Sequence, residues 1–185
     1  MSSINGLKTE SIRAIVIAAP LVVVASLAIA AQDWSTLKIP DGLSFSDFTG
    51  YENWQDVAVS QTETSIKVIV DNPVMMEVFR SGLPASGKVF PDGSKIAKIE
   101  WGFKKNTVAP YFVNVPDKLK TLAFIEKDTK RFPNTHGWAY AQWEYDPPTD
   151  TLKTSKLSPS GAECGFQCHS KVSAQDYIYT AYPKR

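Results

Sequence analysis

Alternation of apolar and polar side chains is the feature that most limits how this chain can fold. A period of two along a sequence indicates a β-strand, because successive side chains of a strand point to opposite faces of a sheet. In one such run Ala97, Ile99 and Trp101 fall on one face and Lys98 falls on the other. The strands that we predict are residues 54–60, 65–71, 95–103, 119–126 and 138–145.

The segments between these strands predict short helices and turns. Asn72 and Pro73 supply an N-cap and a first helical residue, which predicts a short helix over residues 74–81. Residues 90–93 have the composition of a turn, and the polar residues 149–162 are expected to form a loop. The whole pattern predicts an α+β fold, a predominantly antiparallel β-sheet with a few short helices in a single domain.

The N-terminus has the organisation of an export signal. Lys8 and Arg13 precede an uncharged run at residues 14–31, which ends in small residues that suit cleavage after Ala30. We therefore expect residues 1–30 to be a signal peptide and the protein to be periplasmic. An uncleaved membrane anchor is the alternative, because a run of about 18 residues is close to the minimum length of a span.

The remaining chain of about 155 residues has room for one domain. Residues 31–50 are expected to be an irregular lead-in, and residues 51–185 to be the domain itself. The full chain has a formal charge of +1, and removal of the signal peptide leaves the domain close to neutral. Nucleic acid is therefore not an expected partner.

A short motif near the C-terminus carries the chemistry. Cys164 and Cys168, the two cysteines of the chain, are followed directly by His169. In c-type haem proteins two thiols bond to the porphyrin and the next histidine ligates the iron, with a common spacing of Cys-x-x-Cys-His. Positions i and i+4 share a helix face about as well as i and i+3, so the longer spacer keeps this geometry. The motif predicts a haem c cofactor with iron at Cys164, Cys168 and His169.

Two other interpretations of the motif stay open at this point. In an oxidising compartment Cys164 and Cys168 can form a local disulfide in a haem-free secreted domain. A zinc site would need a further ligand, and His136 is the one remaining histidine. His136 lies in a predicted turn, where a solvated loop residue and a second axial ligand of haem iron are the alternatives.

Five landmarks occur in a fixed order from about residue 50 to the C-terminus. With this order the chain resembles the cytochrome P-460 family, to which the beta-type cytochromes c-prime also belong. The landmarks are Asn72-Pro73, the turn at residues 90–93 followed by Lys98, the segment at residues 127–132, the strand at residues 137–140, and the Cys-His motif followed by Asp176-Tyr177.

The resemblance implies a haem-binding antiparallel sheet that commonly assembles as a homodimer. It implies that His169 is the proximal ligand of the iron. In the members that oxidise hydroxylamine, a lysine after the turn is also cross-linked to the porphyrin, and Lys98 occupies the matching position. An ordinary solvated strand lysine is the alternative for Lys98.

The pocket above the iron departs from the hydroxylamine-oxidising members. Their distal glutamate matches Ala123 here, and an arginine of their pocket matches Lys67. We expect Lys67 to keep the basic character and Phe124 to form part of the distal pocket. Glu126 is nearby but falls on the other strand face. Loss of a general acid or base costs about 10²- to 10⁴-fold in rate, so efficient hydroxylamine oxidation is not expected.

These observations predict a five-coordinate haem protein with a largely apolar distal site. It would bind nitric oxide or slowly oxidise a small nitrogen substrate such as hydroxylamine, with an unidentified redox partner. The alternative is a six-coordinate electron-transfer cytochrome, with Met75, Met76 or His136 as the sixth ligand. Met75 and Met76 fall where core packing is the simpler expectation.

Overall fold

The computed structural model describes residues 31–82, 89–108, 110, 112–158, 161, 163 and 165–184. The predicted signal peptide lies outside these residues. No helix of the described part combines the length and apolar composition needed to cross a bilayer.

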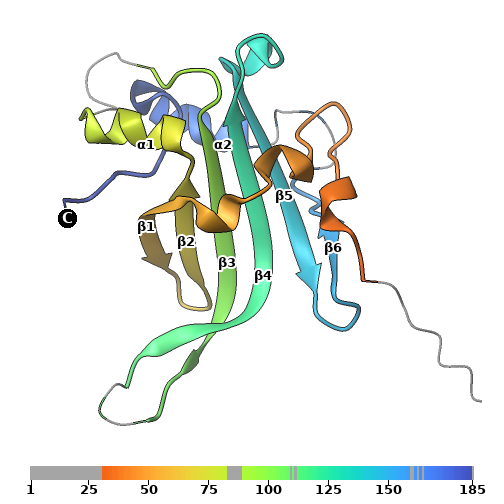
Figure 1. Cartoon of the computed structure of the whole chain (residues 1–185), viewed down its shortest axis with the longest axis vertical. Coiled ribbons are helices and arrows are strands. Elements are labelled where there is room, and N and C mark those ends of the chain that lie inside the picture. The colour runs from red at the N-terminus through yellow and green to blue at the C-terminus, as the bar shows by residue number, and fades with distance from the viewer. Residues whose placement is uncertain are drawn as a thin grey trace, which may run out of the picture. The chain divides into compact units, whose positions relative to one another are not determined.

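Six strands form one sheet in which sequence order and spatial order coincide (Figure 1). Every neighbouring pair is antiparallel. The sheet with its few short helices confirms the predicted α+β fold class. The strands are β1 (Gln55–Gln61), β2 (Ile66–Asp71), β3 (Lys95–Lys105), β4 (Asn114–Lys127), β5 (Trp138–Asp146) and β6 (Thr151–Thr154).

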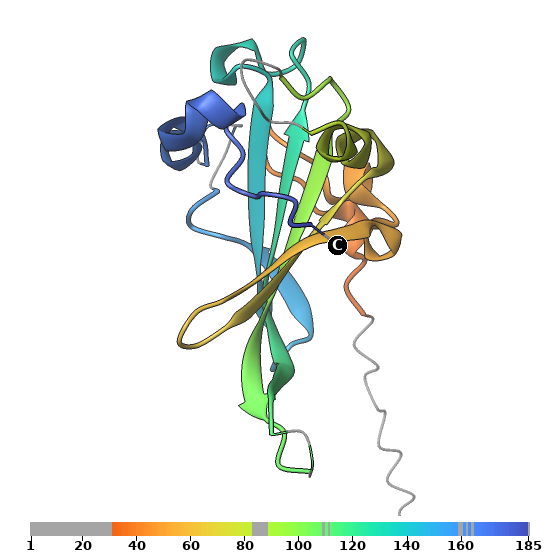
Figure 2. The same ribbon diagram turned by 90° about the vertical axis from the view of Figure 1, so that its left-hand side faces the viewer.

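One face of the sheet is covered by the segment that precedes β1 (Figure 2). This lead-in forms three 3-10 helices, η1 (Trp34–Thr36), η2 (Phe45–Phe48) and η3 (Tyr51–Asn53). Its side chains Ile39, Leu43 and Phe48 are fully buried. The segment expected to be irregular therefore supplies part of a hydrophobic core.

The opposite face carries α1 (Pro73–Arg80) and the C-terminal segment. The predicted cap of α1 is confirmed, because the Asn72 side chain accepts a hydrogen bond from the backbone N–H of Met75. Met75 and Met76 are buried in the core with Ile96 and Ile178. Both methionines therefore pack the core, as their helix positions predicted.

The C-terminal segment consists of α2 (Phe166–His169), η5 (Ser170–Gln175) and an extended tail. Figure 2 shows it on the side of the sheet away from η2 and η3. Residues 177–182, which alternate weakly in the sequence, form no strand. This segment crosses the sheet from β5, against which α2 packs, to the side of α1 and β1, where Tyr182 contacts Phe79 and Gln55.

Strand β6 corrects the expectation of a loop over residues 149–162. Its sequence gives little signal, because Leu152 is its one buried side chain. The strand pairs with β5 on one side. The Gln32 side chain covers the other edge by donating to the Leu152 carbonyl and accepting from the Leu152 N–H, at 3.0 and 2.7 Å. A tertiary contact thus stabilises a strand that its own sequence does not specify.

Candidate functional site

A cavity of about 440 Å³ lies between the sheet and the C-terminal segment. Helix α2 packs directly on β5, and the cavity extends from it across β4 and β3 to β2. The volume is within the range typical of cofactor and small-molecule sites. Side chains that define the cavity are Lys67, Ile69, Lys98, Ala123, Tyr140 and His169.

His169 is held at this cavity by a hydrogen bond through one ring nitrogen. Its Nδ1 lies 2.6 Å from the backbone carbonyl oxygen of Tyr177. A carbonyl only accepts hydrogen bonds, so Nδ1 carries the proton and Nε2 is left with a free lone pair. The rings of Tyr140 and Tyr179 pack against the imidazole, at centroid distances of 4.6 and 5.0 Å. The ring is therefore fixed in position and in tautomer.

Burial favours the neutral form of His169. It lowers the pKa of the imidazole, the hydrogen bond to Tyr177 opposes this shift, and the charge of Lys98 adds to it. A neutral imidazole is the form that ligates a metal ion. The site thus keeps His169 ready to act as a ligand.

Lys98 and Ala123 face each other across β3 and β4 on the floor of the cavity. Burial lowers the pKa of the Lys98 amine, and the neighbouring charge of Lys67 lowers it further, while Glu100 opposes these effects. Lys67 pairs loosely with Glu100, with Nζ and Oε2 4.0 Å apart. The predicted residues Lys67, Lys98, Ala123 and His169 are therefore brought together in one cavity.

Phe124 is not placed as expected. Alternation along β4 turns its ring to the other face of the sheet, where it stacks on Phe48 at 4.3 Å and 9°. Its backbone neighbours the cavity floor, but the ring is fully buried in the core beneath the lead-in. Phe124, like Glu126, lies on the face of β4 opposite to Ala123, because successive side chains of a strand point to opposite faces. The apolar floor is formed by Ile69 and Ile125 instead.

The two cysteines differ in what the structure describes. Cys168 lies in α2, is exposed and borders the cavity. Cys164 lies outside the described residues. The Tyr179 hydroxyl donates to the Cys168 carbonyl at 2.7 Å, which holds α2 against the C-terminal tail.

Gly165 begins this turn under a steric requirement. A Cβ atom at Gly165 would lie 2.4 Å from Cγ of the Tyr140 ring, far inside van der Waals contact. Its φ of −81° is accessible to any residue. Close approach of α2 to β5, rather than backbone freedom, therefore requires glycine.

We expect Gly165→Ala to lower the free energy of unfolding by about 1–3 kcal/mol, the usual cost of overpacking. The clash would also push α2, and His169 with it, away from β5. Gly102→Ala is the matched control, because its Cβ would meet nothing closer than a carbonyl oxygen at 3.8 Å. Thermal unfolding of both variants measures the effect. Equal stability of the two variants would contradict the account.

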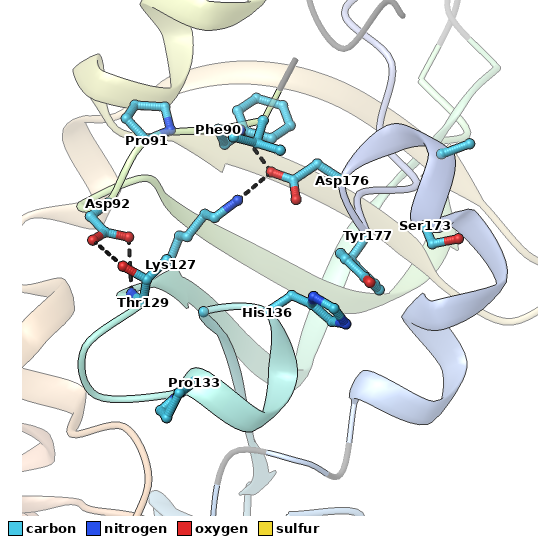
Figure 3. Close-up of a pocket in the computed structure, with 13 residues that line it drawn as sticks. Phe90, Pro91, Asp92, Lys127, Thr129, Pro133, His136, Ser173, Asp176 and Tyr177 are labelled. Carbon is cyan, nitrogen blue, oxygen red and sulfur yellow. Dashed lines mark hydrogen bonds and ion pairs between the residues drawn. The ribbon is translucent and has the colours of Figure 1, made fainter. Parts of the chain in front are cut away.

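The candidate sixth ligands lie away from this cavity. His136 is exposed at an open depression, where its ring stacks on Tyr177 at 5.1 Å (Figure 3). Met75 and Met76 are enclosed in the core. Within the described part of the chain, no three His, Cys, Asp or Glu side chains gather as a metal site.

Sequence reasoning missed the parts of the site that hold His169. The acceptor for its Nδ1 is a backbone carbonyl, which side-chain patterns do not reveal. The sequence identifies Tyr140 as one residue of a predicted strand, but it does not indicate that α2 packs on the Tyr140 ring. Asp176 and Tyr177 are among the sequence landmarks, but their contacts form only in the folded turn.

A comparison with protein families yields one match that spans most of the chain. The model described as cytochrome P-460 matches residues 48–180. The matched segment includes every strand of the sheet and α2. No curated protein matches the chain.

Proposed function

The chain belongs to the cytochrome P-460 family and is a haem protein, and from this premise we propose that it is an exported c-type haem protein that binds small nitrogen species. The haem would occupy the cavity on the sheet, with His169 as the proximal ligand of the iron. Cys168 and Cys164 would form the covalent links to the porphyrin. Export through the N-terminal segment is consistent with haem attachment outside the cytoplasm.

The geometry of His169 is the observation that carries this proposal. Histidines that ligate metals typically donate their other ring N–H to a carbonyl or carboxylate, which fixes the ring and strengthens the ligand. The 2.6 Å contact between His169 Nδ1 and the Tyr177 carbonyl oxygen has this form. The bond keeps the lone pair on Nε2, the nitrogen that would face the iron.

The lining of the cavity suits a porphyrin. Apolar side chains of Ile69, Ile96 and Ile125 come from three neighbouring strands and offer a hydrophobic surface to a flat macrocycle. The Lys67 amine supplies positive charge at the same floor. Haem itself is an apolar ring with two carboxylates, so the donor set and the lining match the group.

The cavity floor also favours small neutral ligands. When bound, the haem iron supplies an open coordination position and a one-electron couple. Ala123 and the isoleucines around that position offer no acid that could move protons. These apolar surroundings also disfavour a ligand with unpaired polar groups, because burying such groups is costly. Binding of nitric oxide is therefore favoured over fast oxidation of hydroxylamine.

Lys98 has the properties needed for a third covalent link to the porphyrin. An amine attacks carbon only in its neutral form, and burial lowers the pKa of Lys98 toward that form. Replacing a porphyrin C–H bond by a bond to Lys98 Nζ releases two protons and two electrons, so a two-electron oxidant such as a peroxide has to take part in forming the link. Its place opposite Ala123 puts it on the cavity floor rather than in solvent. These observations support the cross-link that the family resemblance implies.

The optical spectrum with and without nitric oxide tests this proposed function. Protein matured with an export and haem-attachment system is expected to show a five-coordinate, high-spin spectrum that changes when nitric oxide is added. A low-spin spectrum in both oxidation states, unchanged by nitric oxide, would rule out the open site.

The Ala123→Glu variant tests why hydroxylamine oxidation should be slow. A carboxylate at residue 123 would stand beside Lys98 on the cavity floor, where it can move protons to and from bound substrate. We expect hydroxylamine turnover to rise by about 10²-fold, the lower end of general acid–base effects. Ala123→Gln is the control of similar size without an ionisable group. Equal turnover in the two variants would show that the missing acid is not the cause.

A further inference from the structure

The carboxylate of Asp176 is buried and accepts hydrogen bonds from three different elements, and Figure 3 shows the bonds from Phe90 and Lys127. It accepts from the Phe90 backbone N–H at 2.7 Å and from the Lys127 ammonium group at 2.5 Å. The Trp138 indole N–H donates to its other oxygen at 3.3 Å. The pre-β3 turn, β4 and β5 thus all converge on one carboxylate of the C-terminal segment.

The Lys127–Asp176 ion pair is enclosed, because both side chains are 4% exposed. Burying two charges is costly unless they are paired and fully hydrogen-bonded. The hydrogen bonds from Phe90 and Trp138 add two further donors, so both oxygens of the carboxylate are hydrogen-bonded. The position of Asp176 relative to the sheet is therefore tightly defined.

The backbone at this point is strained. Asp176 has a φ of 48° and Tyr177 a φ of 65°, so two consecutive residues other than glycine adopt the left-handed conformation. Such a conformation persists only where surrounding contacts impose it. The buried carboxylate is the contact that ties this turn to the sheet.

The strained turn sets the direction of the Tyr177 carbonyl. This carbonyl accepts the hydrogen bond from His169 Nδ1. The same turn leaves the Tyr177 ring outside the cavity, stacked on His136. A continuous path therefore joins the Lys127–Asp176 pair to His169 through the backbone of Asp176 and Tyr177.

We propose that Lys127 and Asp176 are positioning residues that set the strength of His169 as an axial ligand. The inference rests on the proposed function, because it requires His169 to ligate haem iron. A hydrogen bond from Nδ1 makes the imidazole a stronger donor, which stabilises the oxidised iron. By aiming the Tyr177 carbonyl at Nδ1, the buried pair keeps the reduction potential low.

The test uses the haem-loaded protein and two observables that follow the axial bond. We expect Asp176→Asn combined with Lys127→Met to shift the iron–histidine stretching band of the ferrous protein to lower frequency and to raise the reduction potential. The double variant removes both charges together, so no unpaired ion is left buried. Asp150→Asn is the matched control, because Asp150 also has a positive φ and a side chain that accepts a hydrogen bond, in an exposed turn.

A milder variant keeps the test decisive where the double variant fails to fold. Trp138→Phe removes a single donor to Asp176 and is expected to shift both observables in the same direction by a smaller amount. A folded variant with full haem content and an unchanged band and potential would overturn the positioning role. A wild-type protein without haem, or without an iron–histidine band, would instead refute the proposed function.

Discussion

The His169→Gly variant is expected to lose the high-spin spectrum of histidine-ligated haem and its response to nitric oxide. His169 lines the cavity, whereas the other histidine of the chain, His136, lies at a separate depression. Substitution of a residue that hydrogen-bonds to a metal ligand typically costs about 10- to 100-fold in metal affinity or activity. Loss of the ligand itself should therefore cost more.

Added imidazole sharpens this test. The glycine variant leaves a space at the cavity that free imidazole can fill, and we expect the wild-type spectrum to return when it is supplied. His136→Ala is the matched control, since its ring is exposed and outside the cavity. A glycine variant whose spectrum equals that of the wild type would show that another group ligates the iron.

The second large effect is expected at Asp71, whose carboxylate is fully buried at the end of β2. Neither carboxylate oxygen has a hydrogen-bond partner among the described residues. Burial alone raises the pKa of this carboxyl from 3.8 to about 8. An uncompensated acid of this kind is neutral in the folded protein at physiological pH.

The sign of the pH dependence follows from the raised pKa. Between about pH 4 and pH 8 the unfolded chain releases the Asp71 proton, whereas the folded protein retains it. This group therefore makes the free energy of unfolding fall as the pH rises through that window. At pH 7 the expected loss is on the order of 4 kcal/mol relative to pH 4.

Asp71→Asn removes the titration while keeping the shape of the side chain. We expect the variant to be more stable than the wild type at pH 7 and to lose most of this advantage near pH 4. Denaturant unfolding of both proteins at several pH values gives the difference directly. Asp41→Asn, at an exposed turn, is the control and is expected to follow the wild type. A variant with the same pH slope as the wild type would contradict the neutral state of Asp71.

The sheet was predictable where the two faces of a strand carry different side chains, as on β3, where Ala97 and Ile99 face the core and Lys98 faces the cavity. Period-two runs locate β1 to β5 within a few residues at most ends, and Asn72 and Pro73 mark α1 correctly. Alternation did not predict the elements that are stabilised mainly by tertiary contacts. Strand β6 has one buried side chain and depends on Gln32, and the lead-in forms core through isolated apolar residues without a regular period.

The site was predictable where it depends on side-chain identity. Lys98 and Ala123 face the same cavity because alternation places them there, and His169 follows from its motif. Phe124 was expected there through its nearness in sequence to Ala123, although a one-residue offset reverses the face of a strand. The Tyr177 carbonyl has no sequence signature, since every residue carries one.

Mapping of the haem-linked peptide tests the central claim most directly. Trypsin should release residues 157–171 as one peptide that contains Cys164, Cys168 and His169. In protein matured with a haem-attachment system, we predict that this peptide carries the mass and the absorbance of one haem, and that residues 96–104 are joined to the same haem through Lys98. The same peptide without haem, with its cysteines reduced or joined in a disulfide, would contradict the account.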